Sequence, residues 1–147
     1  NIEIIRGENK KIYFNEIGAR NGGNFMPDLV SMATGFKMAE ANVNTAIGEY
    51  VDLSYHKTSG KFYAQLILHS HKTGILQSFN RGTKFEKNLK FQKIYYKKGD
   101  LVHRYKDSRF VIGVEIFEFL DKIQCLEFID WINSNNLVNI SSPDDHS

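Results

Sequence analysis

Stretches rich in β-branched and aromatic residues, in which apolar and polar side chains tend to alternate, predict extended strands over much of the chain. The ranges that we expect to form strands are 2–6, 11–19, 61–70, 74–79, 91–96 and 109–119. Apolar residues at helical spacing and helix-ending glycines predict helices at 27–34, 37–47 and 122–133. The pattern therefore predicts the α+β fold class, with mostly antiparallel sheet and flanking helices.

A hairpin is predicted at the start of the chain, with Gly7-Glu8-Asn9-Lys10 as its turn. If the turn is centred on Asn9 and Lys10, Glu3 lies directly across from Glu16. Side chains alternate between the two faces of a strand. One face of this hairpin is then expected to carry Glu3, Ile5, Phe14, Glu16, Gly18 and Arg20.

Two opposed carboxylates need a neutralising charge, because like charges directly across a strand pair are destabilising. A hard divalent cation or Arg20 can provide it. Together with Asn21, Gly22 and Gly23, the glycine-rich turn that follows, these residues predict a site for Mg²⁺ and a phosphate group. An acidic solvent-facing hairpin without a ligand fits the same pattern, and a one-residue slip in register would separate the carboxylates.

Composition limits the other possibilities. The chain has 147 residues, of which 41% are apolar, enough for the core of one ordinary domain. Its single cysteine excludes a disulfide framework and a CxxC motif. No apolar run approaches the ~20 residues that span a bilayer, so we expect no membrane partner and a cytoplasmic location. The chain begins inside a predicted strand without an initiator Met, so we expect a fragment of a longer protein.

Charge is unevenly distributed although the net charge is only +2. Residues 81–106 contain nine Lys or Arg and two acids, whereas residues 115–147 contain seven acids and one Lys. We expect these opposite patches to complement each other or a neighbouring domain. The aromatic residues among the basic ones leave a rival interpretation open, in which this stretch binds single-stranded nucleic acid.

The first third of the chain, residues 2–53, resembles the end of an ATP-grasp catalytic domain. The segments that carry the resemblance are IEII at 2–5, YFNEIGAR at 13–20, NGG at 21–23, PDLV at 27–30, ATG at 33–35 and AIG at 46–48. The resemblance implies that Glu3 and Glu16 hold Mg²⁺ (or Mn²⁺) on the phosphates of ATP, and that Arg20 faces the transferred phosphoryl group. The asparagine that the family usually has two residues after the glutamate is Gly18 here.

The later part of the chain, residues 61–140, resembles the β-rich C-terminal extension of biotin carboxylases and related carboxylate–amine ligases. The resemblance rests on Gly74-Ile75-Leu76, Lys97-Lys98-Gly99-Asp100, Ile112-Gly113-Val114 and the final helix. Biotin carboxylases carry an Arg-x-Asn pattern in this region, where the present chain has Leu68-His69-Ser70. That difference argues against biotin as a substrate.

Together the two resemblances imply three parts: the end of an ATP-grasp domain (1–53), a β-rich extension closed by a helix (54–140), and a frayed tail (141–147). They imply a ligase that activates a small carboxylate as an acyl phosphate, within a range from carboxylate–amine ligases to carbamoyl-phosphate-synthase-like enzymes. The loop and lysine that bind ATP in this superfamily come before the paired acids. We therefore expect the chain alone to be inactive and its partners to be N-terminal domains of the same polypeptide. A degenerate, non-catalytic ATP-grasp scaffold is the other alternative.

Overall fold

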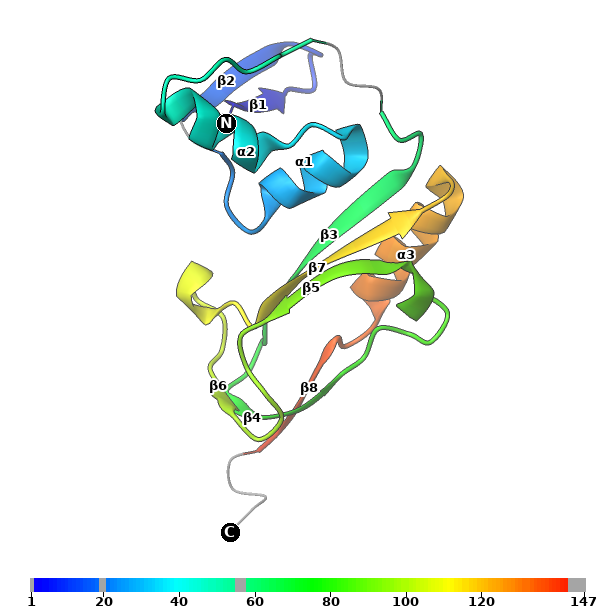
Figure 1. Cartoon of the computed structure of the whole chain (residues 1–147). Coiled ribbons are helices and arrows are strands. Elements are labelled where there is room, and N and C mark those ends of the chain that lie inside the picture. The colour runs from blue at the N-terminus through cyan, green and yellow to red at the C-terminus, as the bar shows by residue number, and fades with distance from the viewer. Residues whose placement is uncertain (1, 19–20, 55–57, 143–147) are drawn as a thin grey trace. The chain divides into compact units, whose positions relative to one another are not determined.

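The computed structural model describes residues 2–18, 21–54 and 58–142. Backbone contacts divide the chain into two compact units, Asn1–His56 and Lys57–Ser147, which are described separately (Figure 1). In the described ranges no helix is both long enough and apolar enough to cross a membrane.

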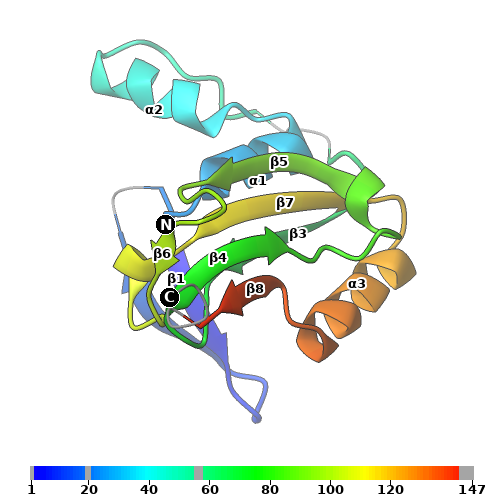
Figure 2. The same cartoon turned by 90° about the horizontal axis from the view of Figure 1, so that it is seen from below.

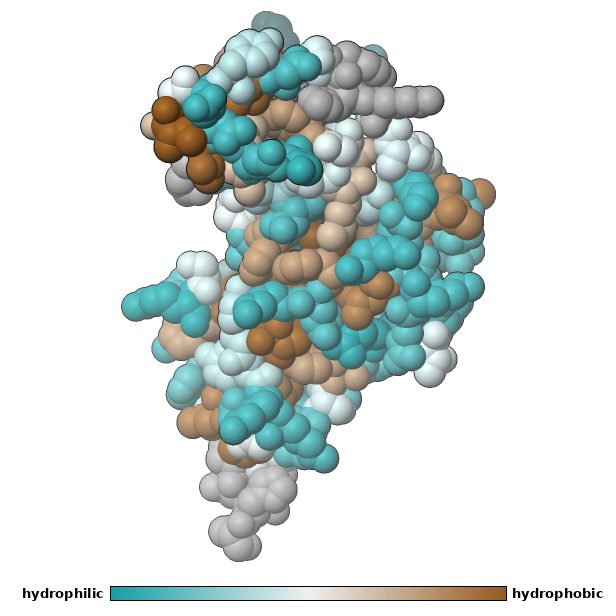
Figure 3. Space-filling view, viewed as in Figure 1, coloured by the Kyte–Doolittle hydropathy of each residue, from teal (hydrophilic) through white to brown (hydrophobic). Residues whose placement is uncertain are grey.

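The N-terminal unit consists of a hairpin followed by two short helices. Strands β1 (Ile2–Arg6) and β2 (Ile12–Ile17) pair antiparallel. Helix α1 (Met26–Thr34) ends at Gly35, whose φ of 74° places it in the left-handed region that glycine adopts easily. Helix α2 (Met38–Ala46) follows after three residues and packs against α1. Apolar side chains remain open to solvent on this unit (Figure 3).

The C-terminal unit contains two three-stranded antiparallel sheets and one helix. The strands are β3 (Phe62–Leu68), β4 (Gly74–Phe79), β5 (Leu89–Ile94), β6 (Leu101–Val102), β7 (Gly113–Phe119) and β8 (Val138–Ser141). Their order is β3-β7-β5 in one sheet and β6-β4-β8 in the other. Helix α3 (Lys122–Ser134) contacts β3 and β7, and Figure 2 shows it beside the sheets. Two 3₁₀ turns, η1 (Glu86–Asn88) and η2 (Ser108–Phe110), complete the unit.

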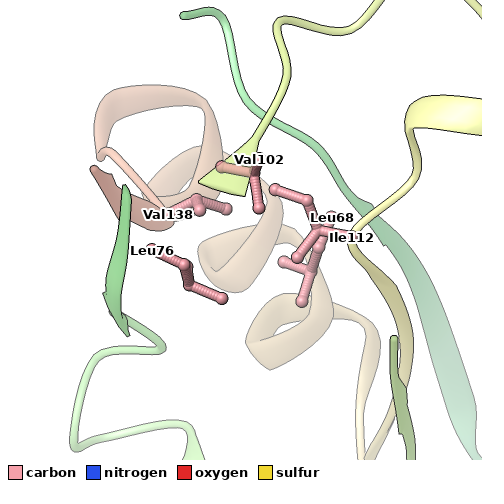
Figure 4. Packing of buried hydrophobic residues seen from close by; sticks show 5 residues of the cluster. All are labelled: Leu68, Leu76, Val102, Ile112 and Val138. Carbon is pink, nitrogen blue, oxygen red and sulfur yellow. The ribbon is translucent and has the colours of Figure 1, made fainter. Parts of the chain in front are cut away.

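One apolar cluster joins the two sheets of this unit. It contains Leu68, Leu76, Val102, Ile112 and Val138, whose side chains converge (Figure 4). Each is at most 4% exposed, so the two sheets share one dry core.

A second, aromatic cluster fixes α3 on β7. The Phe128 ring lies 4.4 Å from that of Phe117 and 5.4 Å from that of Phe119, between ring centroids. Phe85 adds an edge contact to Phe128 at 5.2 Å. Cys125 lies in the same cluster, and burial raises the pKa of its thiol. The free thiol is therefore a small apolar core residue, as its place on the predicted helix indicates.

A buried ion pair joins Arg81 to Glu115 of β7. Glu115 is 0% exposed, and its Oε1 accepts hydrogen bonds from Arg81 Nε at 2.7 Å and from Gln92 Nε2 at 2.8 Å. The other carboxylate oxygen, Oε2, is buried without a hydrogen-bond partner. Because a buried carboxylate is stable only when it is paired, the packing of this region depends on Arg81.

The predicted α+β class and antiparallel sheets are confirmed, and the predicted strands and helices are found with shifted ends. The strand predicted over 109–119 begins only at Gly113, because Asp107 accepts a hydrogen bond from Arg109 N and caps the η2 turn. The short strand β6 was not predicted. Strand β8 was also missed, and Ser141 belongs to it rather than to a frayed tail. Residues 143–147 lie outside the described ranges.

Replacing Arg81 by Met is expected to lower the free energy of unfolding by about 3 kcal/mol, because it leaves the Glu115 carboxylate buried without its cation. Arg109→Met is the matched control: its ion pair with Asp107 is exposed and is expected to contribute less than about 1 kcal/mol. Urea unfolding of both variants measures the difference. If both variants lost the same free energy of unfolding, the buried Glu115 pair would be no more important for stability than the exposed pair.

Glu118, also on β7, accepts hydrogen bonds from Lys61 Nζ at 2.8 Å and from the Tyr63 hydroxyl at 2.9 Å. These bonds favour the charged carboxylate and hold the pKa of Glu118 below its ordinary value of 4.5. The contribution of Glu118 to the free energy of unfolding is therefore fully present above its ordinary pKa of 4.5. That contribution is lost as the pH falls through the lowered pKa of the folded state. We expect Glu118→Gln to be less stable than the unsubstituted protein at neutral pH and equally stable in strong acid. A stability gap that persists in acid would contradict this.

Candidate metal and phosphate site

The hairpin brings Glu3 and Glu16 together as cross-strand partners. In the register of β1 and β2, Glu3 pairs with Glu16 and Ile2 pairs with Ile17. Directly opposed residues have Cβ atoms about 5 Å apart, which is close enough for two carboxylates to approach one cation. Both side chains are exposed.

The route to this register differs from the predicted one. Gly7 N donates to Lys11 O at 2.9 Å, and Lys10 N donates to Gly7 O at 2.9 Å. Lys10 has a φ of 61°, so the loop contains three residues and ends with one in the left-handed region, rather than two centred on Asn9 and Lys10. Along the strands that follow, this longer loop pairs Ile5 with Tyr13. The predicted two-residue turn is therefore wrong.

A β-bulge restores the pairing of the two glutamates. Ile4 pairs with Phe14 while Glu3 pairs with Glu16, so Asn15 is the extra residue. The prediction that Phe14 shares a face with the glutamates and Ile5 is wrong, because the bulge shifts the alternation of side chains between Phe14 and Glu16. The longer loop shifts the strand register by one residue and the bulge shifts it back, so Glu3 and Glu16 are partners as predicted.

Asn15 is a site residue that the sequence patterns did not identify. Its Nδ2 donates to Glu3 Oε2 at 3.1 Å, so the amide lies beside the carboxylate pair. Regular alternation puts Asn15 on the opposite face from Glu16, and only the bulge changes this. The available signal in the sequence was a polar residue next to Glu16 on an otherwise apolar strand.

The turn that follows β2 leads directly into α1. Gly23 O accepts a hydrogen bond from Met26 N at 3.1 Å. A Cβ added to Gly22 would lie 3.2 Å from Met26 Cβ, so this glycine allows a close approach to the helix. The residue before the helix, Phe25, has a φ of 61°, and its side chain makes no capping hydrogen bond. Arg20, the predicted phosphate contact, lies outside the described residues, so its role stays a prediction.

The donor groups present suit Mg²⁺ or Mn²⁺. Among the described residues no three His, Cys, Asp or Glu side chains gather into a metal-binding group. The site instead offers the carboxylates of Glu3 and Glu16 and the amide of Asn15. Magnesium keeps several waters and is usually bound by one or two carboxylates together with substrate phosphates. A nearly complete cage of protein ligands is therefore not required.

Two other candidate sites receive less support. The ring centroids of His69 and His71 lie 5.2 Å apart, but the two residues belong to no three-residue metal cluster in the part of the chain that the structure describes.

Basic side chains of residues 81–106 pair with acids of residues 115–130, as the charge pattern predicts. These ion pairs are Arg81–Glu115 at 2.7 Å, Lys84–Glu127 at 2.6 Å and Lys90–Glu118 at 3.7 Å. Phe85, one of the interleaved aromatic residues, is 5% exposed and belongs to the core. The nucleic-acid interpretation is therefore not favoured.

Comparison with known proteins gives matches in structure only. No protein-family model matches the sequence, and no curated protein matches it. The fold is similar to phosphoribosylglycinamide synthetase from Anaerococcus prevotii, with a TM-score of 0.65 and 21% identity over 96% of this chain. It is also similar to L-amino acid ligase from Bacillus licheniformis, with a TM-score of 0.73 and 15% identity over 96% of this chain.

The chain spans about a third of those two proteins, 36% of the first and 35% of the second. Both are ATP-grasp ligases, so the resemblance read from the sequence is confirmed at the level of the fold. The chain has the fold of one part of an ATP-grasp ligase.

Proposed function

We propose that this chain is the metal-binding part of an ATP-dependent ligase that activates a small carboxylate as an acyl phosphate. In this reaction the γ-phosphoryl group of ATP passes to a carboxylate oxygen, and ADP leaves. A nucleophile, usually an amine, then attacks the acyl carbon and releases phosphate. The observation that carries the proposal is the pairing of Glu3 with Glu16 in a chain whose fold matches two ATP-grasp ligases.

The proposed roles of the residues follow from their charges and positions. Glu3 and Glu16 would hold Mg²⁺ or Mn²⁺, which supplies neutralisation of the phosphate oxygens during phosphoryl transfer. Arg20 would present its planar guanidinium to the transferred group. The backbone of Asn21, Gly22 and Gly23 would approach an anionic substrate closely.

We further propose that the ATP-binding half belongs to N-terminal domains of the same polypeptide and that the chain alone is inactive. The chain spans only about a third of each of the two similar ligases, which supports the proposal of further domains. Exposed apolar residues on the hairpin support it too: the paired residues Ile4 and Phe14 are 55% and 71% exposed. An isolated two-stranded ribbon is only marginally stable, so another layer is expected to cover this apolar face.

Replacing Glu16 by Gln in the full-length protein is expected to lower Mg²⁺-dependent ADP formation at least about 100-fold, because a charged ligand is lost. Glu8→Gln is the matched control, since Glu8 is exposed in the hairpin turn and away from the pair. A coupled assay of ADP release with a panel of amino acids and other small carboxylates measures both. Full Mg²⁺-dependent turnover by Glu16→Gln would contradict the proposal. Absence of turnover by the unsubstituted protein would also contradict it, and would leave the non-catalytic scaffold as the interpretation.

Arg20→Lys keeps the positive charge but loses the two-pronged geometry of the guanidinium. We expect kcat to fall at least about tenfold, while the KM for Mg²⁺ stays within about twofold of its original value. Steady-state kinetics over a range of Mg²⁺ and ATP concentrations separates the two constants. An unchanged kcat would exclude Arg20 from contact with the transferred phosphoryl group.

A further inference from the structure

The site lacks one group that the family resemblance leads one to expect. Gly18 stands where an amide-bearing asparagine usually follows the second glutamate by two residues. A Cβ added to Gly18 would lie 3.9 Å from Glu16 Oε1, so a side chain there would extend beside the glutamate. With glycine at this position, the carbonyl oxygen of an amide must come from elsewhere or be absent.

An amide lies at the same pair of carboxylates, beside the bulge. In an antiparallel bulge, two residues of one strand lie opposite a single residue of the other. Here Asn15 and Glu16 lie opposite Glu3. The 3.1 Å hydrogen bond from Asn15 Nδ2 to Glu3 Oε2 uses only the donor end of the amide. Its carbonyl oxygen, Oδ1, is a hard ligand of the kind that Mg²⁺ and Mn²⁺ prefer.

We propose that Asn15 is the third cation-binding group of this site, orienting the Glu3 carboxylate through Nδ2 and contributing Oδ1 to the cation. This inference rests on the proposed function. It makes the bulge a functional feature, because the register of the preceding pairs alone would set Asn15 opposite Glu3, and the bulge adds Glu16 beside them. The amide would then precede the glutamate by one residue instead of following it by two.

Gly18 provides an independent rescue position. It is not among the described glycines with positive φ, and an added Cβ meets no atom closer than 3.9 Å. Asparagine is therefore sterically compatible with position 18. A double variant, Asn15→Ala with Gly18→Asn, moves the amide from the bulge to the position that the family commonly uses.

Direct binding of Mn²⁺ to the full-length protein, followed by electron paramagnetic resonance, tests the proposal without relying on turnover. We expect Asn15→Ala to weaken Mn²⁺ binding about 10–100-fold and the added Gly18→Asn to restore it to within about threefold of the unsubstituted protein. Asn9→Ala is the control for a weakened hairpin. Asn9 hydrogen-bonds Lys11 N and the Tyr13 hydroxyl in the turn region, away from the carboxylates. We expect its Mn²⁺ affinity to change less than about twofold.

Each outcome separates this inference from the proposed function. If Asn15→Ala binds Mn²⁺ as tightly as the unsubstituted protein while Glu16→Gln does not bind it, Asn15 is not a ligand but the metal site stands. Equal weakening by Asn9→Ala, or absence of rescue by Gly18→Asn, would also overturn the role of Asn15. If Glu16→Gln binds Mn²⁺ normally, the proposed metal site itself is wrong.

A second variant covers the case in which Asn15→Ala does not fold. Asn15→Asp keeps an oxygen donor and adds a third negative charge, whose repulsion a bound cation would relieve. We therefore expect Mn²⁺ to raise the melting temperature of Asn15→Asp more than that of the unsubstituted protein. An equal or smaller rise would overturn the role of Asn15.

Discussion

The approach of two like charges across a pair of adjacent strands is the constraint on which this account depends. Glu3 and Glu16 are direct partners in the hairpin, and such a pair is unfavourable unless a positive charge joins it. Arg20 or a hard divalent cation can supply that charge, as the sequence pattern predicts. We propose the cation, because it would also give the hairpin a chemical role. The fold itself is similar to that of two ATP-grasp ligases.

Much of the fold was predictable because local patterns and the final packing agree. The apolar stripe of α3 predicts the buried Phe128, and the turn at Lys97-Lys98-Gly99-Asp100 forms with Asp100 N donating to Lys97 O at 3.0 Å. The two missed strands are short and have little pattern of their own. Strand β6 has two residues and β8 has four, and both exist because β4 pairs with them. Such strands depend on partners distant in sequence, which local periodicity does not reveal.

The candidate site was predicted in outline, and for a reason that was partly wrong. The pairing of Glu3 with Glu16 is found, but it results from a longer loop and a bulge rather than from a regular two-residue turn. Loop length and bulges depend on backbone conformations such as the positive φ of Lys10, which no residue pattern here signals. For the same reason the amide of Asn15 was missed. The metal-binding roles, and the contribution of Arg20, remain predictions, as does the division into a catalytic part and an extension.

Anomalous diffraction from crystals of the full-length protein grown with Mn²⁺ and ADP tests the central claim most directly. The account predicts one anomalous peak at coordination distance from the carboxylates of both Glu3 and Glu16, with nucleotide phosphate oxygens among the other ligands. A nucleotide bound without a peak at these residues, or with the two carboxylates directed to opposite faces of the hairpin, would contradict it.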